Sequence, residues 1–134
     1  MNIPTNLKYS TEHEWVKLDN DVATIGITDY AQSQLGEIVF VDVQPDLEGE
    51  TLAKGEIFGA IEAVKTVADA FMPVSGEIIE INVAVNEVYE NSDKQESVVN
   101  TDPYGAGWMI KVKINNPAEL DELMNSEDYE DFIA

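Results

Sequence analysis

Residues 56–76, EIFGAIEAVKTVADAFMPVSG, carry one lysine, Lys65, between two short segments of apolar and small residues. Both segments have the length and residue pattern of β-strands. Gly55 precedes Lys65 by ten residues and Gly76 follows it by eleven. Glycine suits points where a chain turns sharply or approaches another strand. The stretch therefore predicts a β-hairpin with Lys65 at its tip, held away from the body of the protein.

Outside the hairpin, the residue pattern predicts further strands and a few short helices. A turn sequence, Asp19-Asn20-Asp21, separates two alternating segments. Thr28 can cap a helix that stops before Gly36, and Asn116 with Pro117 suits the start of another helix. The expected strands are 14–18, 22–26, 38–41, 56–62, 66–72, 77–81 and 108–114, and helices are expected over 29–35, from 117 and from 126, with irregular chain over 82–100.

The length and composition fit one globular domain over residues 1–134. A chain of 134 residues is long enough to build a core and too short for two full-sized domains. Hydrophobic residues make up 44% of it, which argues against a disordered chain. Cysteine is absent and His13 is the only histidine, which excludes disulfides, thiolate nucleophiles and multi-histidine metal sites.

The charge of the chain is strongly negative. Seven lysines and no arginines stand against 27 acidic residues, giving a net charge of −20. Nucleic acid and anionic membrane surfaces would be repelled, so we expect neither as a partner. Two explanations of the acidity stay open: solubility, or attraction to partner proteins that have basic docking surfaces.

The sequence carries no sign of a membrane span or a targeting segment. No apolar run approaches the ~20 residues that cross a bilayer. The start of the chain, Met1 to Tyr9, lacks the apolar and basic features of a signal or transit peptide. We expect a soluble, monomeric, cytoplasmic protein, with the mature form of a mitochondrial matrix protein as the alternative.

A lysine at a protruding turn suits covalent modification better than catalysis. Its amine is open to a modifying enzyme, and acylation would extend an already long and flexible side chain. A Schiff-base lysine instead needs a desolvated pocket that lowers its pKa, and the nearby Glu62 would raise the pKa of Lys65. An ordinary solvated lysine is the plain alternative, and only the residues around Lys65 distinguish it from a modified lysine.

The hairpin resembles lipoyl attachment hairpins, which have a Glu three residues before the modified lysine and a Gly eleven residues after it. Glu62 and Gly76 stand at these positions around Lys65. Beyond the hairpin, the chain resembles the H proteins of the glycine cleavage system in several segments, in order and over nearly its whole length. Ala63 is a departure, because the family often has Ser there. The matching segments are Tyr9, EHEWV (12–16), VATIGITDYA (22–31), LGEIVFV (35–41), DPYG (102–105) and GWMI (107–110).

This resemblance implies a fold and a function. The fold would be mainly β, the flattened β-barrel of lipoyl and biotinyl domains (a barrel–sandwich hybrid) with short helices. A lipoyl-binding core would span about 22–104, and a C-terminal strand and helical tail about 105–134. The chain would carry the aminomethyl group of glycine on lipoate and catalyse no step itself. Its partners would be the pyridoxal-phosphate-dependent glycine decarboxylase (P protein), the aminomethyltransferase (T protein), dihydrolipoyl dehydrogenase (L protein) and the lipoyl-attaching enzyme.

The resemblance also implies the site residues. Lys65 would bear the lipoyl group, and Glu62 and Gly76 would serve recognition by the lipoyl-attaching enzyme. Glu14 and Asp69, with Glu12 nearby, would line a cleft that holds the loaded arm. Carboxylates suit that task because the amine of the loaded arm can be a cation. We expect no catalytic residue and no metal ligand.

Two other features have plain interpretations. His13, beside Trp15, is expected to be a structural or surface residue, because acid–base catalysis needs positioned partners. The aromatic residues Trp15, Phe40, Phe71 and Trp108 are expected in the core or in the wall of the cleft.

Four alternatives remain open. A biotinyl domain would normally have methionines beside the lysine, whereas Val64 and Thr66 flank it here. A lipoyl domain or lipoyl-relay protein that serves 2-oxo acid dehydrogenase complexes would explain the hairpin but not the matching segments at both ends of the chain. The other two are an enzyme that uses Lys65 as a Schiff-base nucleophile and an interaction protein that is never modified.

Overall fold

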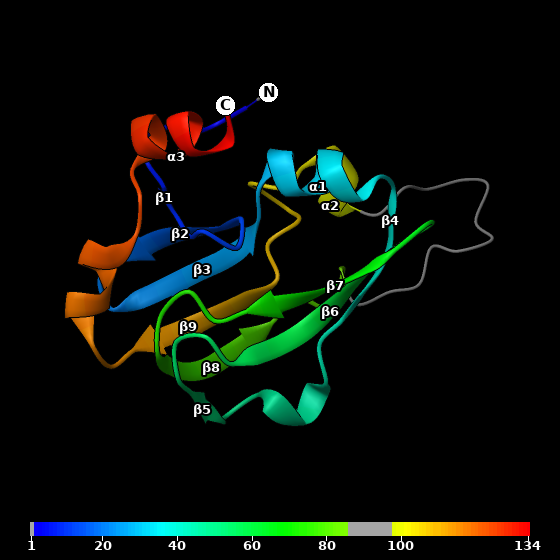
Figure 1. The fold of residues 1–134 in the computed structure, drawn as a ribbon. Helices are drawn as coiled ribbons and strands as arrows, with labels where there is room; N and C mark the ends of the chain where they lie inside the picture. The colour runs from blue at the N-terminus through cyan, green and yellow to red at the C-terminus, as the bar shows by residue number, and fades with distance from the viewer. Residues whose placement is uncertain (1, 86–97) are drawn as a thin grey trace.

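Two antiparallel sheets form the body of the protein (Figure 1), as described by a computed structural model for residues 2–85 and 98–134. The larger sheet has six strands in the order β1-β2-β3-β9-β8-β5, and the smaller sheet has three in the order β4-β6-β7. The strands are β1 (Lys8–Tyr9), β2 (Glu14–Asp19), β3 (Val22–Ile27), β4 (Ile38–Asp42), β5 (Thr51–Leu52), β6 (Ile57–Ala63), β7 (Val67–Phe71), β8 (Gly76–Ile81) and β9 (Ile110–Ile114).

The helices are short, and two of them have a side-chain cap at the N-terminus. The Ala31 N–H donates to the Thr28 hydroxyl at 3.1 Å, and Gly36 ends the same helix at φ +88°, so that prediction is confirmed. The Asn125 side chain caps the last helix by accepting from the Asp128 N–H at 2.8 Å. The helices are α1 (Asp29–Leu35), α2 (Val98–Thr101) and α3 (Ser126–Ile133), with 3₁₀ turns η1 (Pro45–Leu47) and η2 (Pro117–Glu122).

The predicted fold class, mainly β with short helices and a C-terminal helix, is confirmed. The two sheets form separate ladders, consistent with a flattened barrel. The helix expected from 117 is present as the short 3₁₀ helix η2, which begins at Pro117. Two other local predictions are wrong. Asn116 makes no side-chain cap to this helix. The last strand begins at Ile110, not at Trp108. Much of the irregular chain expected over 82–100 lies outside the described residues.

The main core lies between the two sheets. Ile25, Val112 and Ile78 of the larger sheet are fully buried, and Phe58 of the smaller sheet has only 1% of its surface exposed. Burying an aliphatic or aromatic side chain of this size contributes about 1.5–3 kcal/mol. The core therefore holds the β6–β7 hairpin firmly at its base. No helix among the described residues has the length and apolarity needed to cross a membrane.

A second, smaller cluster lies under α3, near both ends of the chain (Figure 1). Tyr9, Trp15 and Tyr129 are buried in it, and the rings of Tyr9 and Tyr129 stack at a centroid distance of 4.6 Å. Tyr9 and Met124 also form an isolated antiparallel bridge. The C-terminal helix is thereby fixed to β1 and β2, close to the start of α1.

Candidate functional site

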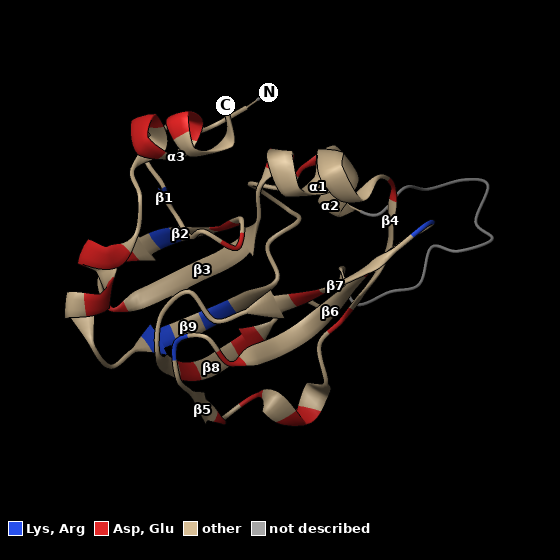
Figure 2. Cartoon of the chain, viewed as in Figure 1, with Lys and Arg blue, Asp and Glu red and all other residues tan. Residues whose placement is uncertain are grey.

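Lys65 lies in the middle of the three-residue loop, residues 64–66, that joins β6 to β7. The Ala63 N–H donates to the Thr66 carbonyl at 2.8 Å, so the strands pair up to the loop. The Val64 N–H donates to the Glu37 carbonyl at 3.1 Å, which ties the tip to the chain just before β4. Lys65 is exposed and has no ionic partner among the described residues. In Figure 2 the tip of the hairpin is blue and projects from the body.

The tip presents apolar surface around this amine. Val64 is 64% exposed and Val67 is 60% exposed, whereas Glu62 is half-buried and pairs with Val67. This setting differs from the desolvated pocket that a Schiff-base lysine requires. It suits a lysine that another protein must reach.

Gly76 is needed where it lies for a steric reason. It is buried at the start of β8, where it pairs with Ile114 and Leu52. A Cβ at this position would overlap the carbonyl oxygen of Lys113 and come within 2.5 Å of the Val112 side chain. Only glycine fits this close approach of β8 and β9. Its expected role in recognition by the lipoyl-attaching enzyme stays a prediction.

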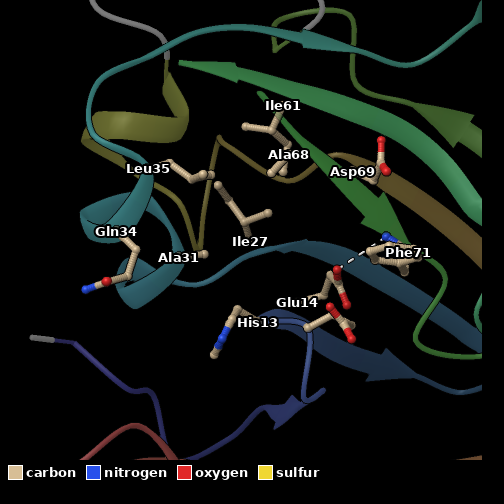
Figure 3. Close-up of a pocket in the computed structure, with 11 residues that line it drawn as sticks. His13, Glu14, Ile27, Ala31, Gln34, Leu35, Ile61, Ala68, Asp69 and Phe71 are labelled. Carbon is tan, nitrogen blue, oxygen red and sulfur yellow. Dashed lines mark hydrogen bonds between the residues drawn. The ribbon is translucent and has the colours of Figure 1, made fainter. Parts of the chain in front are cut away.

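A cleft of about 270 Å³ lies between β2, α1 and the β6–β7 hairpin. Figure 3 shows that its two sides differ: apolar side chains gather towards α1, and carboxylates gather towards the end of β7. This volume is slightly below the ~300–1,000 Å³ typical of sites for drug-sized ligands, so the cleft suits the end of a slender arm. The apolar residues are Ile27, Ala31, Leu35, Ile61, Ala68 and Phe71, and the others are Glu12, His13, Glu14, Gln34 and Asp69.

Glu14 is the buried acid of the cleft, with only 2% of its surface exposed. Its carboxylate accepts hydrogen bonds from the Ser10 hydroxyl at 2.5 Å and from the Phe71 N–H at 3.3 Å. Burial raises the pKa of Glu14 to about 7, and these two hydrogen bonds oppose the rise while the charge of Glu12 adds to it. A cation entering the cleft would be paired with this carboxylate and would favour its charged form.

The structure brings all three expected acids to the same cleft. Asp69, on β7 opposite Ala60, and Glu12, just before β2, are both exposed and lie at its edge. One acid is therefore buried and fixed, and two stay in contact with water.

Sequence reasoning missed part of the cleft wall. Ala31, Gln34 and Leu35 line it from one face of α1, and their spacing of three and four residues was the available signal. His13 also lines the cleft, and its Nδ1 lies 2.9 Å from the Tyr129 hydroxyl. Burial lowers the pKa of His13, and the charge of Glu12 opposes this shift.

A lipoyl group fits these residues. Lys65 lies only three residues before Ala68 of the cleft wall, roughly 10 Å along a strand. A lysine side chain extended by lipoate can cover that distance. Apolar walls suit its hydrocarbon part, and carboxylates suit an amine at its end.

Comparisons with known proteins agree on one family. The family model described as "Glycine cleavage H-protein" matches residues 7–134. The glycine cleavage system H protein of Bacteroides fragilis is 56% identical over 129 residues, covering 96% of this chain and 95% of the relative. That of Carboxydothermus hydrogenoformans is 50% identical over 131 residues, covering 98% and 94%. The crystal structure of a glycine cleavage system H protein from Mycobacterium marinum superposes with a TM-score of 0.78 at 33% identity, covering 96% of this chain and 97% of that one. The chain therefore belongs to the glycine cleavage H-protein family.

Proposed function

We propose that this chain is the lipoyl-bearing carrier of a glycine cleavage system, with lipoate attached through an amide to Nζ of Lys65. The observation that supports this most directly is an exposed lysine without an ionic partner among the described residues, at a hairpin tip beside an acid-lined cleft. Residues 1–134 act as one carrier domain and catalyse no step. The names of the relatives support the assignment to glycine cleavage.

When bound, the lipoyl group would supply a disulfide: one sulfur would bond to the aminomethyl group of glycine as the glycine carboxylate leaves as carbon dioxide, and the other sulfur would become a thiol. The residues of the chain then shelter the loaded arm. Glu14 and Asp69, with Glu12 nearby, would hold the amine as a cation by charge-assisted hydrogen bonds. The apolar walls formed by Leu35 and Ile61 exclude water from the carbon between nitrogen and sulfur.

The proposed partners follow from this role. The P protein would load the lipoyl arm, the T protein would unload it, and the L protein would reoxidise it. A lipoyl-attaching enzyme first modifies Lys65, guided by Glu62 and Gly76. The protein would work as a monomer in the cytoplasm, where these enzymes meet it.

The experiment that tests the proposal compares Lys65→Arg with Lys17→Arg, a matched change at another exposed lysine. Each protein is incubated with a lipoyl-attaching enzyme, and its intact mass is measured by mass spectrometry. It is then added to the P, T and L proteins with glycine. Wild type and Lys17→Arg should gain one lipoyl group and support cleavage. Lys65→Arg should fold normally and gain nothing, because arginine cannot form the amide. A lipoyl group mapped to another lysine, or no group at all, would contradict the proposal.

A further inference from the structure

The hydroxyl of Tyr129, on the C-terminal helix α3, joins two segments that are more than a hundred residues away in the sequence. Its oxygen lies 2.9 Å from Nδ1 of His13 and 2.8 Å from the hydroxyl oxygen of Thr28. Tyr129 is fully buried and its ring stacks on Tyr9 with an interplanar angle of 8°. The hydroxyl is therefore held in one place by packing of the ring beneath it.

One of the two joined residues lines the cleft, and the other caps a helix that lines it. His13 lines the cleft directly, next to Glu14. Thr28 caps α1, which supplies Ala31, Gln34 and Leu35 to the wall. Tyr129 itself lines none of it. The Thr28 N–H also donates to the His13 carbonyl at 3.0 Å, so the two walls meet at this point.

The backbone of His13 gives this junction a further role. Its φ is +69°, in the left-handed region that non-glycine residues rarely adopt. The following residue, Glu14, enters the cleft wall as a buried carboxylate. A hydrogen bond that holds the His13 ring against α3 stabilises this turn, because the ring and the strained backbone belong to one residue.

We infer that Tyr129 is a positioning residue for the cleft: its hydroxyl holds His13 and the start of α1 together and so sets the spacing of the two walls around the arm. This role rests on the proposed function, because the arm is what the cleft shelters. Burial raises the pKa of Tyr129 to about 12, so the hydroxyl keeps its proton and its hydrogen bonds at physiological pH.

The test uses Tyr129→Phe, with Tyr9→Phe as the matched control. Both changes remove one hydroxyl from the same ring stack, but the Tyr9 hydroxyl donates to the Pro4 carbonyl and touches neither wall of the cleft. The first measurement is the ¹⁵N NMR spectrum of the imidazole, which is free of overlap because His13 is the only histidine. Tyr129→Phe should shift the Nδ1 resonance and change the pKa of the ring, and Tyr9→Phe should change neither.

The second measurement times spontaneous release of the aminomethyl group from fully lipoylated, loaded protein. A neutral hydrogen bond of this kind predicts release about two- to tenfold faster in Tyr129→Phe, with Tyr9→Phe equal to wild type. Adding His13→Gly, which tolerates the positive φ, should give an effect that is not additive with Tyr129→Phe.

The outcomes separate this inference from the proposed function. If wild type releases the group as fast as a free lipoamide adduct, the sheltering cleft is wrong. If wild type protects the group and Tyr129→Phe protects it equally, with an unchanged His13 spectrum, the positioning role is wrong and the carrier function stands. Equal acceleration by Tyr9→Phe would reduce Tyr129 to a general contributor to packing, which also overturns the inference.

Discussion

The carboxylate of Glu14 links the two sheets across the cleft, because its Oε2 accepts a hydrogen bond from the N–H of Phe71 at 3.3 Å. Glu14 begins β2 of the larger sheet, and Phe71 ends β7 of the smaller one. The other carboxylate oxygen accepts from Ser10. Both oxygens are thus held by the protein, and the charge of this group affects stability as well as binding.

We expect the stability of the protein to depend on pH through Glu14. Its pKa is raised from 4.5 to about 7 on folding, so the folded state keeps a proton that the unfolded chain loses. The favourable contribution is complete below pH 4.5 and is lost as pH rises through 7, by about 3 kcal/mol. Denaturant unfolding of wild type and Glu14→Gln at pH 5 and pH 8 checks this. The difference in free energy of unfolding between the two proteins should change by about 3 kcal/mol between these pH values. An unchanged difference would contradict the role of Glu14.

The carboxylates of the cleft should slow loss of the loaded group. A hydrogen bond to a charged group contributes roughly 1.5–3 kcal/mol, so Glu14→Gln and Asp69→Asn should each speed release about ten- to a hundredfold. Neither change should prevent lipoylation, because Lys65 lies outside the cleft lining. Asp46→Asn, an exposed acid in η1, is the control and should behave as wild type. Unchanged release in both cleft variants would assign these acids to the solvated surface.

Gly76→Ala should destabilise the protein far more than Gly49→Ala. The added Cβ at position 76 meets the backbone of β9, whereas the space around Gly49 is open and only its φ of +93° resists a side chain. We expect a loss of about 3 kcal/mol or more at position 76 and about 1 kcal/mol at position 49. Thermal unfolding measures both. Lipoylation of the folded fraction then shows whether Gly76 also serves recognition, and equal losses of stability would refute the steric explanation.

Association with the glycine decarboxylase should slow as salt rises if the acidity attracts partners. The net charge is −20, and the Debye length falls from about 30 Å at 0.01 M salt to about 8 Å at physiological salt. The on-rate in stopped-flow mixing should drop by about tenfold or more. An uncharged osmolyte at equal osmolarity is the control. A salt-independent rate would leave solubility as the reason for the charge.

The sequence by itself determined the local parts of the site. A lysine between two β-patterned segments predicted the hairpin, and the pair Thr28 and Gly36 predicted α1, because strand periodicity and helix capping are read from residues close together in the chain. The three acids assigned to the cleft by family resemblance, Glu12, Glu14 and Asp69, do lie around one cavity.

Only the tertiary structure decided how these parts meet. The burial of Glu14, and with it the raised pKa, depends on packing of β2 against the end of β7. The contact of His13 with Tyr129 spans 116 residues, and the tight fit of Gly76 depends on its pairing with β9. No local pattern encodes such contacts, because they arise from the register and layering of segments far apart in the chain.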